Sequence, residues 1–195
     1  TDRFIVSNYS LDTLEGKQAC KRDLLKTFGL EEDSDRPVIG CISRLVEQKG
    51  FDLVMQVAHR MMQLGFCFVL LGSGADELEN FFQKLHEAFP TRVGTYVGFN
   101  NTLAHKIEAG ADLFLMPSRY EPCGLNQIYS LKYGTVPVVR ATGGLDDTIE
   151  DFDPQRQIGN GFKFHEYQAE RLLEKLKEAL SIYADKKLWR NLMEN

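Results

Sequence analysis

Short apolar runs alternate with longer amphipathic stretches from residue 37 to the end of the chain. Five short runs, most of them apolar over successive residues, lie at 37–43, 66–72, 92–99, 112–118 and 136–141. Strands without an in–out alternation of apolar and polar residues are typical of a sheet that is covered on both faces. The pattern therefore predicts a parallel β-sheet at the centre of the molecule.

The stretches between and after these runs have the apolar spacing of helices. We expect helices at 51–62, 78–88, 101–109, 124–133 and 172–183. In 51–62, 78–88 and 172–183, apolar residues recur three or four positions apart. Strands that alternate with helices in this way build βαβ units. The sequence thus predicts an α/β fold with a doubly wound, mostly parallel, Rossmann-like sheet.

The 195 residues match the usual size of one domain, and they contain no internal repeat. We expect a single domain over 1–195, with a lead-in segment (1–36) that contains a helix and a Rossmann-like core (37–195). The run GLEEDSDRP (29–37) resembles a linker between the two parts. The chain starts without Met and without a signal-peptide pattern, so we interpret it as a segment of a longer protein.

The net charge and the positions of the cysteines limit which binding partners and which cellular compartment we expect. The net charge of −5 and the pI near 5.4 leave no broad cationic face, so we expect neither nucleic acid nor a membrane as partner. Four widely spaced cysteines without a CxxC pair indicate reduced thiols and a reducing compartment. The four histidines do not cluster with Cys, Asp or Glu, and we predict no metal site.

In a doubly wound sheet, ligands bind outside the carboxyl ends of the strands. The first such loop, SRLVEQKG, places Arg44 and Lys49 just before a helix. Two cations beside the N-terminus of a helix favour an anion such as a phosphate. For this loop alone, solvated surface charges are the alternative interpretation.

The second loop, LGSG, contains Gly72, Ser73 and Gly74 ahead of the next predicted helix. Two glycines allow a ligand to approach the backbone closely. Because the loop fits neither a GxGxxG nor a P-loop pattern, a tight structural turn is the alternative.

The third and fifth loops offer an aromatic ring and a double glycine. Gly98 and Phe99 end the third run, where an exposed ring can stack on a nucleobase, although a core position is the alternative for Phe99. We expect Asn101 or Thr102 to cap the helix that follows. The glycines at 143–144 permit a close backbone approach or form a plain turn.

The fourth loop, within MPSRYEPCGLNQIYSLKYG, carries a lone carboxylate. Glu121 lies between Pro117 and Pro122, just before a helix predicted to start near Gly124. Free backbone N–H groups at 124–126 would then point into a cleft beside the acid. A simple N-terminal cap is the alternative role of Glu121.

Taken together, SRLVEQKG, LGSG, EPCGLNQIYSLKYGTVPVV and TGGLDDT resemble, in order and spacing, the C-terminal half of bacterial glycogen synthases and plant starch synthases. The resemblance extends from GKQACKRDLLKTFGL to LWRNLM. It implies a retaining glycosyltransferase of the GT-B type, with this chain as its donor-nucleotide domain. The implied reaction transfers glucose from ADP-glucose to the non-reducing end of an α-1,4-glucan, without a metal or other cofactor.

The resemblance also implies a role for individual residues. Arg44 and Lys49 would hold the diphosphate and stabilise the departing nucleotide, and Glu121 would face the donor sugar. The residues implied to bind the nucleotide sugar are Gly72, Ser73, Gly74, Gly98, Phe99, Cys123, Gly124, Leu125, Asn126 and Tyr129. Tyr129 stands where many GT-B enzymes have a second Glu near the ribose, so the ribose contact stays unassigned.

The family's N-terminal domain, with its KxGGL motif and acceptor-facing surface, is absent from these residues. We therefore expect the isolated domain to bind ADP or ADP-glucose weakly and not to elongate glucan. The alternatives are another GT-B glycosyltransferase that uses a UDP- or GDP-sugar, and a non-catalytic module that binds nucleotide or glucan. The expected location is the cytoplasm, or the plastid stroma in a plant.

Overall fold

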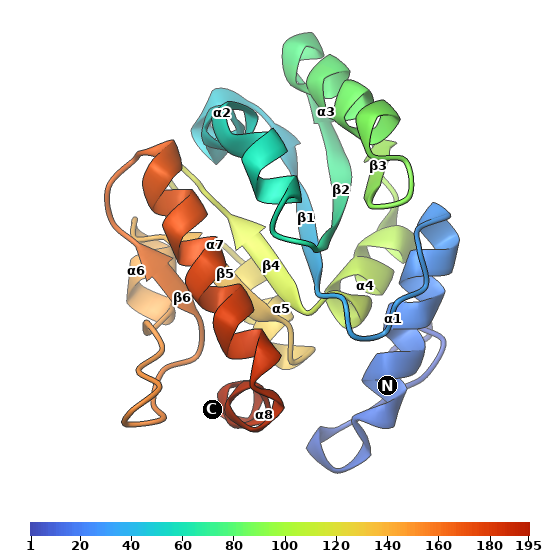
Figure 1. Ribbon diagram of the computed structural model, residues 1–195, viewed down its shortest axis with the longest axis vertical. Coiled ribbons are helices and arrows are strands. Elements are labelled where there is room, and N and C mark those ends of the chain that lie inside the picture. Colours follow the sequence, from blue (N-terminus) through green and yellow to red (C-terminus); the bar gives the residue numbers. More distant parts are fainter.

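The computed structural model describes residues 1–195 and contains one six-stranded sheet (Figure 1). Its strand order is β3-β2-β1-β4-β5-β6, and every pairing is parallel. The strands are β1 (Val38–Leu45), β2 (Cys67–Gly74), β3 (Val93–Val97), β4 (Leu113–Met116), β5 (Val136–Arg140) and β6 (Phe162–Phe164). The predicted doubly wound, parallel sheet is confirmed.

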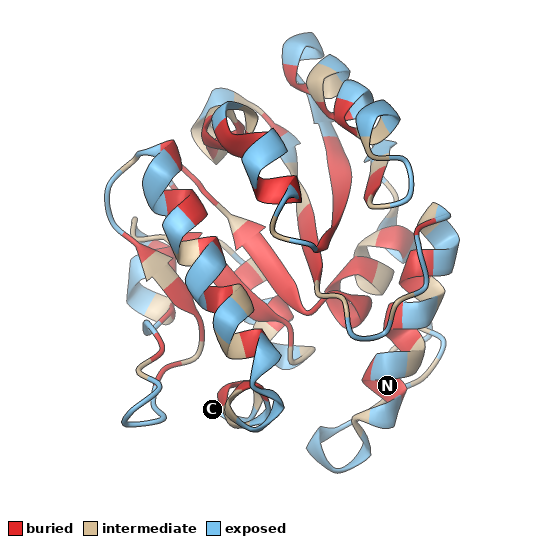
Figure 2. Cartoon of the chain, viewed as in Figure 1, coloured by how far each residue is buried: buried red, intermediate tan, exposed pale blue.

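Helices cover both faces of the sheet. They are α1 (Glu15–Phe28), α2 (Phe51–Met62), α3 (Asp76–Ala88), α4 (Asn101–Gly110), α5 (Asn126–Lys132), α6 (Gly144–Thr148), α7 (Ala169–Ala184) and α8 (Lys186–Glu194), with the 3₁₀ turns η1 (Leu11–Thr13) and η2 (Glu47–Lys49). The larger apolar cluster joins the sheet to α2, α3, α7 and α8, and a second cluster joins it to α1 and α4. Figure 2 shows the strands buried and the outer faces of the helices exposed. None of these helices combines the length and the apolar character that a membrane crossing requires.

The structure differs from the sequence prediction at several boundaries. The edge strand β6 is absent from the prediction because its three residues, of which only the first and last are buried, form no apolar run. Helix α5 begins at Asn126 and not near Gly124, because Gly124 has a left-handed φ of 67°. Asn100, not Asn101 or Thr102, caps α4, since its side chain accepts the Leu103 N–H at 2.9 Å.

Two buried lysines fasten the lead-in helix α1 to the core. Lys21 forms an ion pair with Asp112 (Nζ to Oδ2, 2.8 Å), and the same carboxylate accepts the Val38 N–H at the start of β1. The Lys17 ammonium donates to carbonyl oxygens at the end of α4 and to the hydroxyl of Thr135. Desolvation lowers the pKa of Lys17 to about 8. Helix α1 of the lead-in segment is therefore anchored to the core by buried polar contacts.

Candidate functional site

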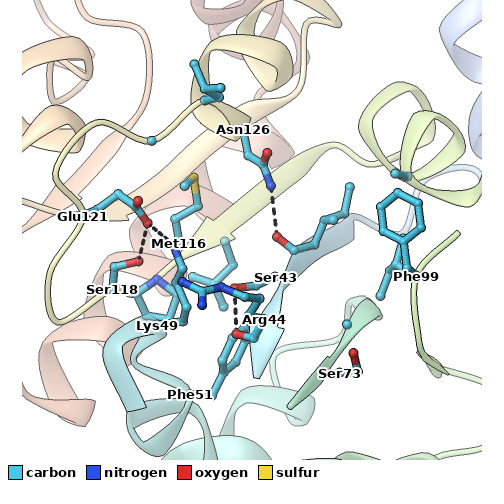
Figure 3. A pocket seen from close by; sticks show the side chains of 18 of the residues that line it. Ser43, Arg44, Lys49, Phe51, Ser73, Phe99, Met116, Ser118, Glu121 and Asn126 are labelled. Atoms are coloured by element: carbon cyan, nitrogen blue, oxygen red, sulfur yellow. Dashed lines mark hydrogen bonds and ion pairs between the residues drawn. The ribbon is translucent and has the colours of Figure 1, made fainter. Parts of the chain in front are cut away.

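A cavity of about 340 Å³ lies at the carboxyl edge of the sheet (Figure 3). Its walls come from the ends of β1, β2 and β4 and from the loops after β3 and β4. The chain runs outward from β1 to β2 and β3 and then crosses back to β4 on the other side of β1. Such a reversal opens a crevice between neighbouring loops, which is where doubly wound sheets bind their ligands.

Most of the predicted site residues line this cavity. They are Arg44, Lys49, Gly72, Ser73, Gly98, Phe99, Glu121, Gly124, Leu125 and Asn126. Gly74 and Cys123 are not among the lining residues, and Tyr129 lines an adjoining cavity that shares Phe99 and Asn126 with the first. The structure thus brings residues from four separate loops into one place, as parallel strands require.

Lys49 and Glu121 form an ion pair at the wall of the cavity. The Lys49 Nζ lies 2.5 Å from Oε2 of Glu121, and the two side chains are 19% and 9% exposed. The buried hydroxyl of Ser118 donates to the same carboxylate oxygen at 3.3 Å. These contacts hold the Glu121 carboxylate in place (Figure 3). The role of Glu121 as a plain helix cap finds no support, because no backbone N–H donates to it.

Gly50 explains why Lys49 and Glu121 meet. The residue has a φ of 74° and directly follows η2, and a Cβ added to it would lie 1.9 Å from the carbonyl oxygen of Pro117. Only glycine allows the end of η2 to lie this close to the end of β4. The Gln48 carbonyl accepts the Arg119 N–H at 2.9 Å and strengthens the contact between the two loops. The motifs SRLVEQKG and MPSRYEPCG contain Gly50 and Ser118, but sequence analysis assigned a role to neither residue, because each acts through a contact with the other loop or with the carboxylate.

Arg44 provides an unpaired positive charge beside this ion pair. It lies at the end of β1, opposite Ser73 in the register of β2, and is exposed. No acidic side chain forms an ion pair with it, whereas Lys49 is neutralised by Glu121. Figure 3 shows both cationic side chains in the same cavity. A net positive charge at a concave site attracts an anionic ligand.

Backbone N–H groups add to the positive potential of the cavity. The N–H groups of residues 124–127 have no acceptor within the chain. The Asn126 side chain is not free, because its Nδ2 donates to the Ile42 carbonyl at 3.0 Å and ties the start of α5 to the end of β1. The free N–H groups therefore belong to a segment that is held in position.

The glycines of the second and fifth loops serve close backbone packing. A Cβ on Gly72 or Gly74 would lie 2.0 or 2.1 Å from a carbonyl oxygen of β1. Both residues belong to strand β2 and pair with Ser43 and Leu45 of β1, so LGSG is extended strand and not a tight turn. At Gly143 and Gly144 a Cβ would lie 2.2 and 1.9 Å from the carbonyl oxygens of Glu121 and Cys123, respectively. Gly143 and Gly144 therefore allow the start of α6 to pack directly against the backbone of the loop that carries Glu121.

Aromatic and apolar side chains form the rim of the cavity. Phe99 is 87% exposed, which excludes the alternative of a core position. Leu125 is also exposed and lines the same cavity, and the exposed Tyr129 lines the adjoining one. Of the four cysteines only Cys123 is exposed, and no group of three or more His, Cys, Asp or Glu side chains gathers closely enough to hold a metal ion.

The doubly wound sheet, with two cations and a held carboxylate at its switch point, has the architecture of the C-terminal, Rossmann-like half of a GT-B glycosyltransferase. Residues 25–195 match the family of glycosyl transferases group 1, and the chain belongs to that family. Among curated relatives, it is 54% identical over 195 residues to the glycogen synthase of Koribacter versatilis and 50% identical over 195 residues to that of Kosmotoga olearia. Both alignments cover 100% of this chain and 40% and 41% of the relatives, so the chain spans well under half of their length.

Solved structures agree with this assignment. The catalytic domain of starch synthase IV from Arabidopsis thaliana, bound to ADP and acarbose, superposes with a TM-score of 0.90 at 35% identity, over 100% of this chain and 42% of that one. The C-terminal domain of a glycosyl transferase group 1 protein from Francisella tularensis superposes with a TM-score of 0.68 at 16% identity, over 90% of this chain and 88% of that one. This second likeness shows the fold alone.

Proposed function

We propose that this chain is the donor-binding domain of a glucan synthase that transfers glucose from ADP-glucose to the non-reducing end of an α-1,4-glucan with retention. The observation that carries the proposal is the Lys49–Glu121 ion pair beside the unpaired Arg44, at the switch point of the sheet. The glycogen synthases of similar sequence and the starch synthase structure with bound ADP support it.

In the proposed complex, Arg44, Lys49 and the backbone N–H groups at 124–126 bind the diphosphate. The guanidinium and ammonium groups make charge-assisted hydrogen bonds, and the N–H groups have no competing acceptor in the chain. Negative charge on the leaving diphosphate grows as the bond to glucose breaks. Donors that are already in position stabilise this charge without reorganisation, which is the main electrostatic contribution to such catalysis.

Glu121 orients the donor sugar in this proposal. Its carboxylate is held by Lys49 and Ser118, so it presents a fixed acceptor to sugar hydroxyl groups. The Lys49 ammonium has three N–H donors and can contact Glu121 and a phosphate oxygen at once. The pair would thus link the position of the sugar to that of the diphosphate.

The exposed ring of Phe99 is the proposed stacking surface for the adenine base. It lies on the same cavity as the cations, beside Gly98, whose positive φ of 138° turns the chain at the end of β3. Stacking contributes about 1–3 kcal/mol per base in other nucleotide-binding proteins. Ser73 and the nearby Tyr129 remain proposed contacts of the nucleotide sugar.

The proposed enzyme needs more than this chain. The relatives are more than twice as long, and we infer an N-terminal domain that faces the cavity and provides the acceptor surface. The domain alone should bind ADP or ADP-glucose weakly and transfer no glucose. Three buried thiols, at Cys20, Cys41 and Cys67, support a reducing compartment such as the cytoplasm.

Calorimetric titration of the chain with ADP, ADP-glucose and UDP-glucose tests the proposal. We expect ADP and ADP-glucose to bind, UDP-glucose to bind at least tenfold more weakly, and Arg44→Ala to abolish measurable binding. A preference for UDP-glucose would favour the alternative of another GT-B glycosyltransferase. Full-length enzyme that binds ADP-glucose but transfers no glucose to glucan would favour a non-catalytic module.

A further inference from the structure

Gln127 lies beneath the loop that carries Glu121. It is the second residue of α5, and it is completely buried. Its Nε2 lies 3.2 Å from the carbonyl oxygens of both Cys123 and Gly124, and 3.3 Å from the hydroxyl oxygen of Thr148 on α6. One side chain therefore contacts two consecutive peptide groups of the loop from the interior side.

The surrounding atoms determine which way the Gln127 amide points. Two of its neighbours are carbonyl oxygens, and the Thr148 hydroxyl already donates its hydrogen to the Gly144 carbonyl at 2.5 Å. All three can only accept, so the NH₂ group must face them. As a result, Oε1 of Gln127 is buried without any donor. An unsatisfied buried oxygen costs stability, which calls for a compensating role.

The contacts of Gln127 also set the direction of two backbone N–H groups. In a trans peptide the C=O and N–H bonds point in opposite directions. The Cys123 carbonyl belongs to the same peptide as the Gly124 N–H, and the Gly124 carbonyl to the same peptide as the Leu125 N–H. With both carbonyls directed at Gln127, both N–H groups point away from the buried amide. Neither has an acceptor in the chain, and Gly124 and Leu125 line the cavity.

We propose that Gln127 is a positioning residue that directs the Gly124 and Leu125 N–H groups into the cavity, where they bind the diphosphate of the donor. The proposal rests on the proposed function, because it assigns the ligand of that same cavity. Gly124 fits this arrangement: its φ is 67°, and a Cβ on it would lie 2.6 Å from Oε1 of Gln127. A residue with a side chain at position 124 would therefore collide with the Gln127 amide, and glycine leaves room for it.

The test compares Gln127→Met with Ser130→Ala. The first variant keeps the approximate volume of the side chain but removes both donors. The second removes a fully buried hydroxyl from the same helix, which contacts Glu108 and not the loop. Both variants should lose thermal stability. We expect only Gln127→Met to weaken ADP binding, by about tenfold, since two charge-assisted hydrogen bonds lose their alignment, while Ser130→Ala changes it less than threefold.

An NMR titration of the unmodified chain provides a second readout that needs no variant. On addition of ADP, the amide proton resonances of Gly124 and Leu125 should move downfield, as expected for new hydrogen bonds to phosphate. If ADP does not bind at all, the proposed function fails. If ADP binds but these two resonances do not move downfield, or if Gln127→Met binds ADP as tightly as Ser130→Ala, the role of Gln127 is refuted and the proposed function stands.

Discussion

Gly50→Ala tests the close approach that brings Lys49 to Glu121. The new Cβ would lie 1.9 Å from the Pro117 carbonyl oxygen, whereas ordinary contact starts at 3.4 Å, so the two segments must separate by about 1.5 Å (3.4 − 1.9). Both are backbone segments that cannot rotate away. A separation of this size would lengthen or reorient the 2.5 Å contact between Lys49 and Glu121, because the two residues lie on the two segments that must move apart.

The expected loss of folding stability in Gly50→Ala has two parts, and a control variant separates them. A left-handed φ of 74° costs a non-glycine residue about 1–2 kcal/mol, and the steric overlap adds about 1–3 kcal/mol. Gly65→Ala is the matched control, because Gly65 has a φ of 82° but no atom within 4 Å of the added Cβ. We expect Gly50→Ala to lose about 2–5 kcal/mol in urea denaturation and Gly65→Ala only the backbone part of about 1–2 kcal/mol.

The two variants should also differ in enzymatic turnover. A shift of about 1 Å in a catalytic group can reduce turnover about 100-fold, so Gly50→Ala in a full-length enzyme should lose at least that factor, and Gly65→Ala almost none. Equal stability losses in the two variants, together with normal turnover of Gly50→Ala, would refute the role of the close approach.

Three further predictions follow from the site and the core. Glu121→Ala in a full-length enzyme should lower kcat about 100-fold or more while changing ADP affinity little, whereas Arg44→Ala should reduce both; near-normal turnover of the first variant contradicts the role of Glu121. Phe99→Ala should weaken ADP binding about tenfold without lowering the melting temperature, because the ring is 87% exposed; unchanged affinity would exclude stacking. Desolvation raises the pKa of buried Glu108 from 4.5 to about 8, so its contribution to stability is complete below pH 4.5 and is lost as the pH rises through 8. Relative to Glu108→Gln, the unmodified chain should lose about 4 kcal/mol in urea denaturation between pH 5 and 9, and a constant difference would contradict a raised pKa.

Strands and helices could be predicted from the sequence where the local pattern of apolar residues reflects their burial. Five of the six strands lie in short, mostly apolar runs, and the central strands β1, β2, β4 and β5 bury most of their residues because helices cover both faces of the sheet. Strand β6 lies at the edge and buries only Phe162 and Phe164, so its pattern is too short to detect. The start of α5 also escaped prediction, because the left-handed conformation of Gly124 depends on the packing of Gln127 beneath it.

The candidate site was predictable only as a set of separate loops. Parallel topology places the carboxyl ends of β1, β2 and β4 along one edge, so residues at those ends, such as Arg44 and Glu121, could be grouped from the sequence. The pairing of Lys49 with Glu121 could not, because it depends on Gly50 lying against the carbonyl of Pro117, a residue 67 positions away (117 − 50).

The sequence by itself determined the alternation of strands and helices up to β5 and the loops that carry chemistry. These properties follow from local periodicity, composition and the geometry of parallel strands. Only the tertiary structure decided which glycines serve packing, which cation is paired, and how Gln127 directs the backbone of the loop. The pairing of Lys49 and the packing of Gly50 depend on contacts between segments distant in the chain. The contacts of Gln127 with Cys123 and Gly124 are local, but they depend on a left-handed turn that no hydrophobic pattern reveals.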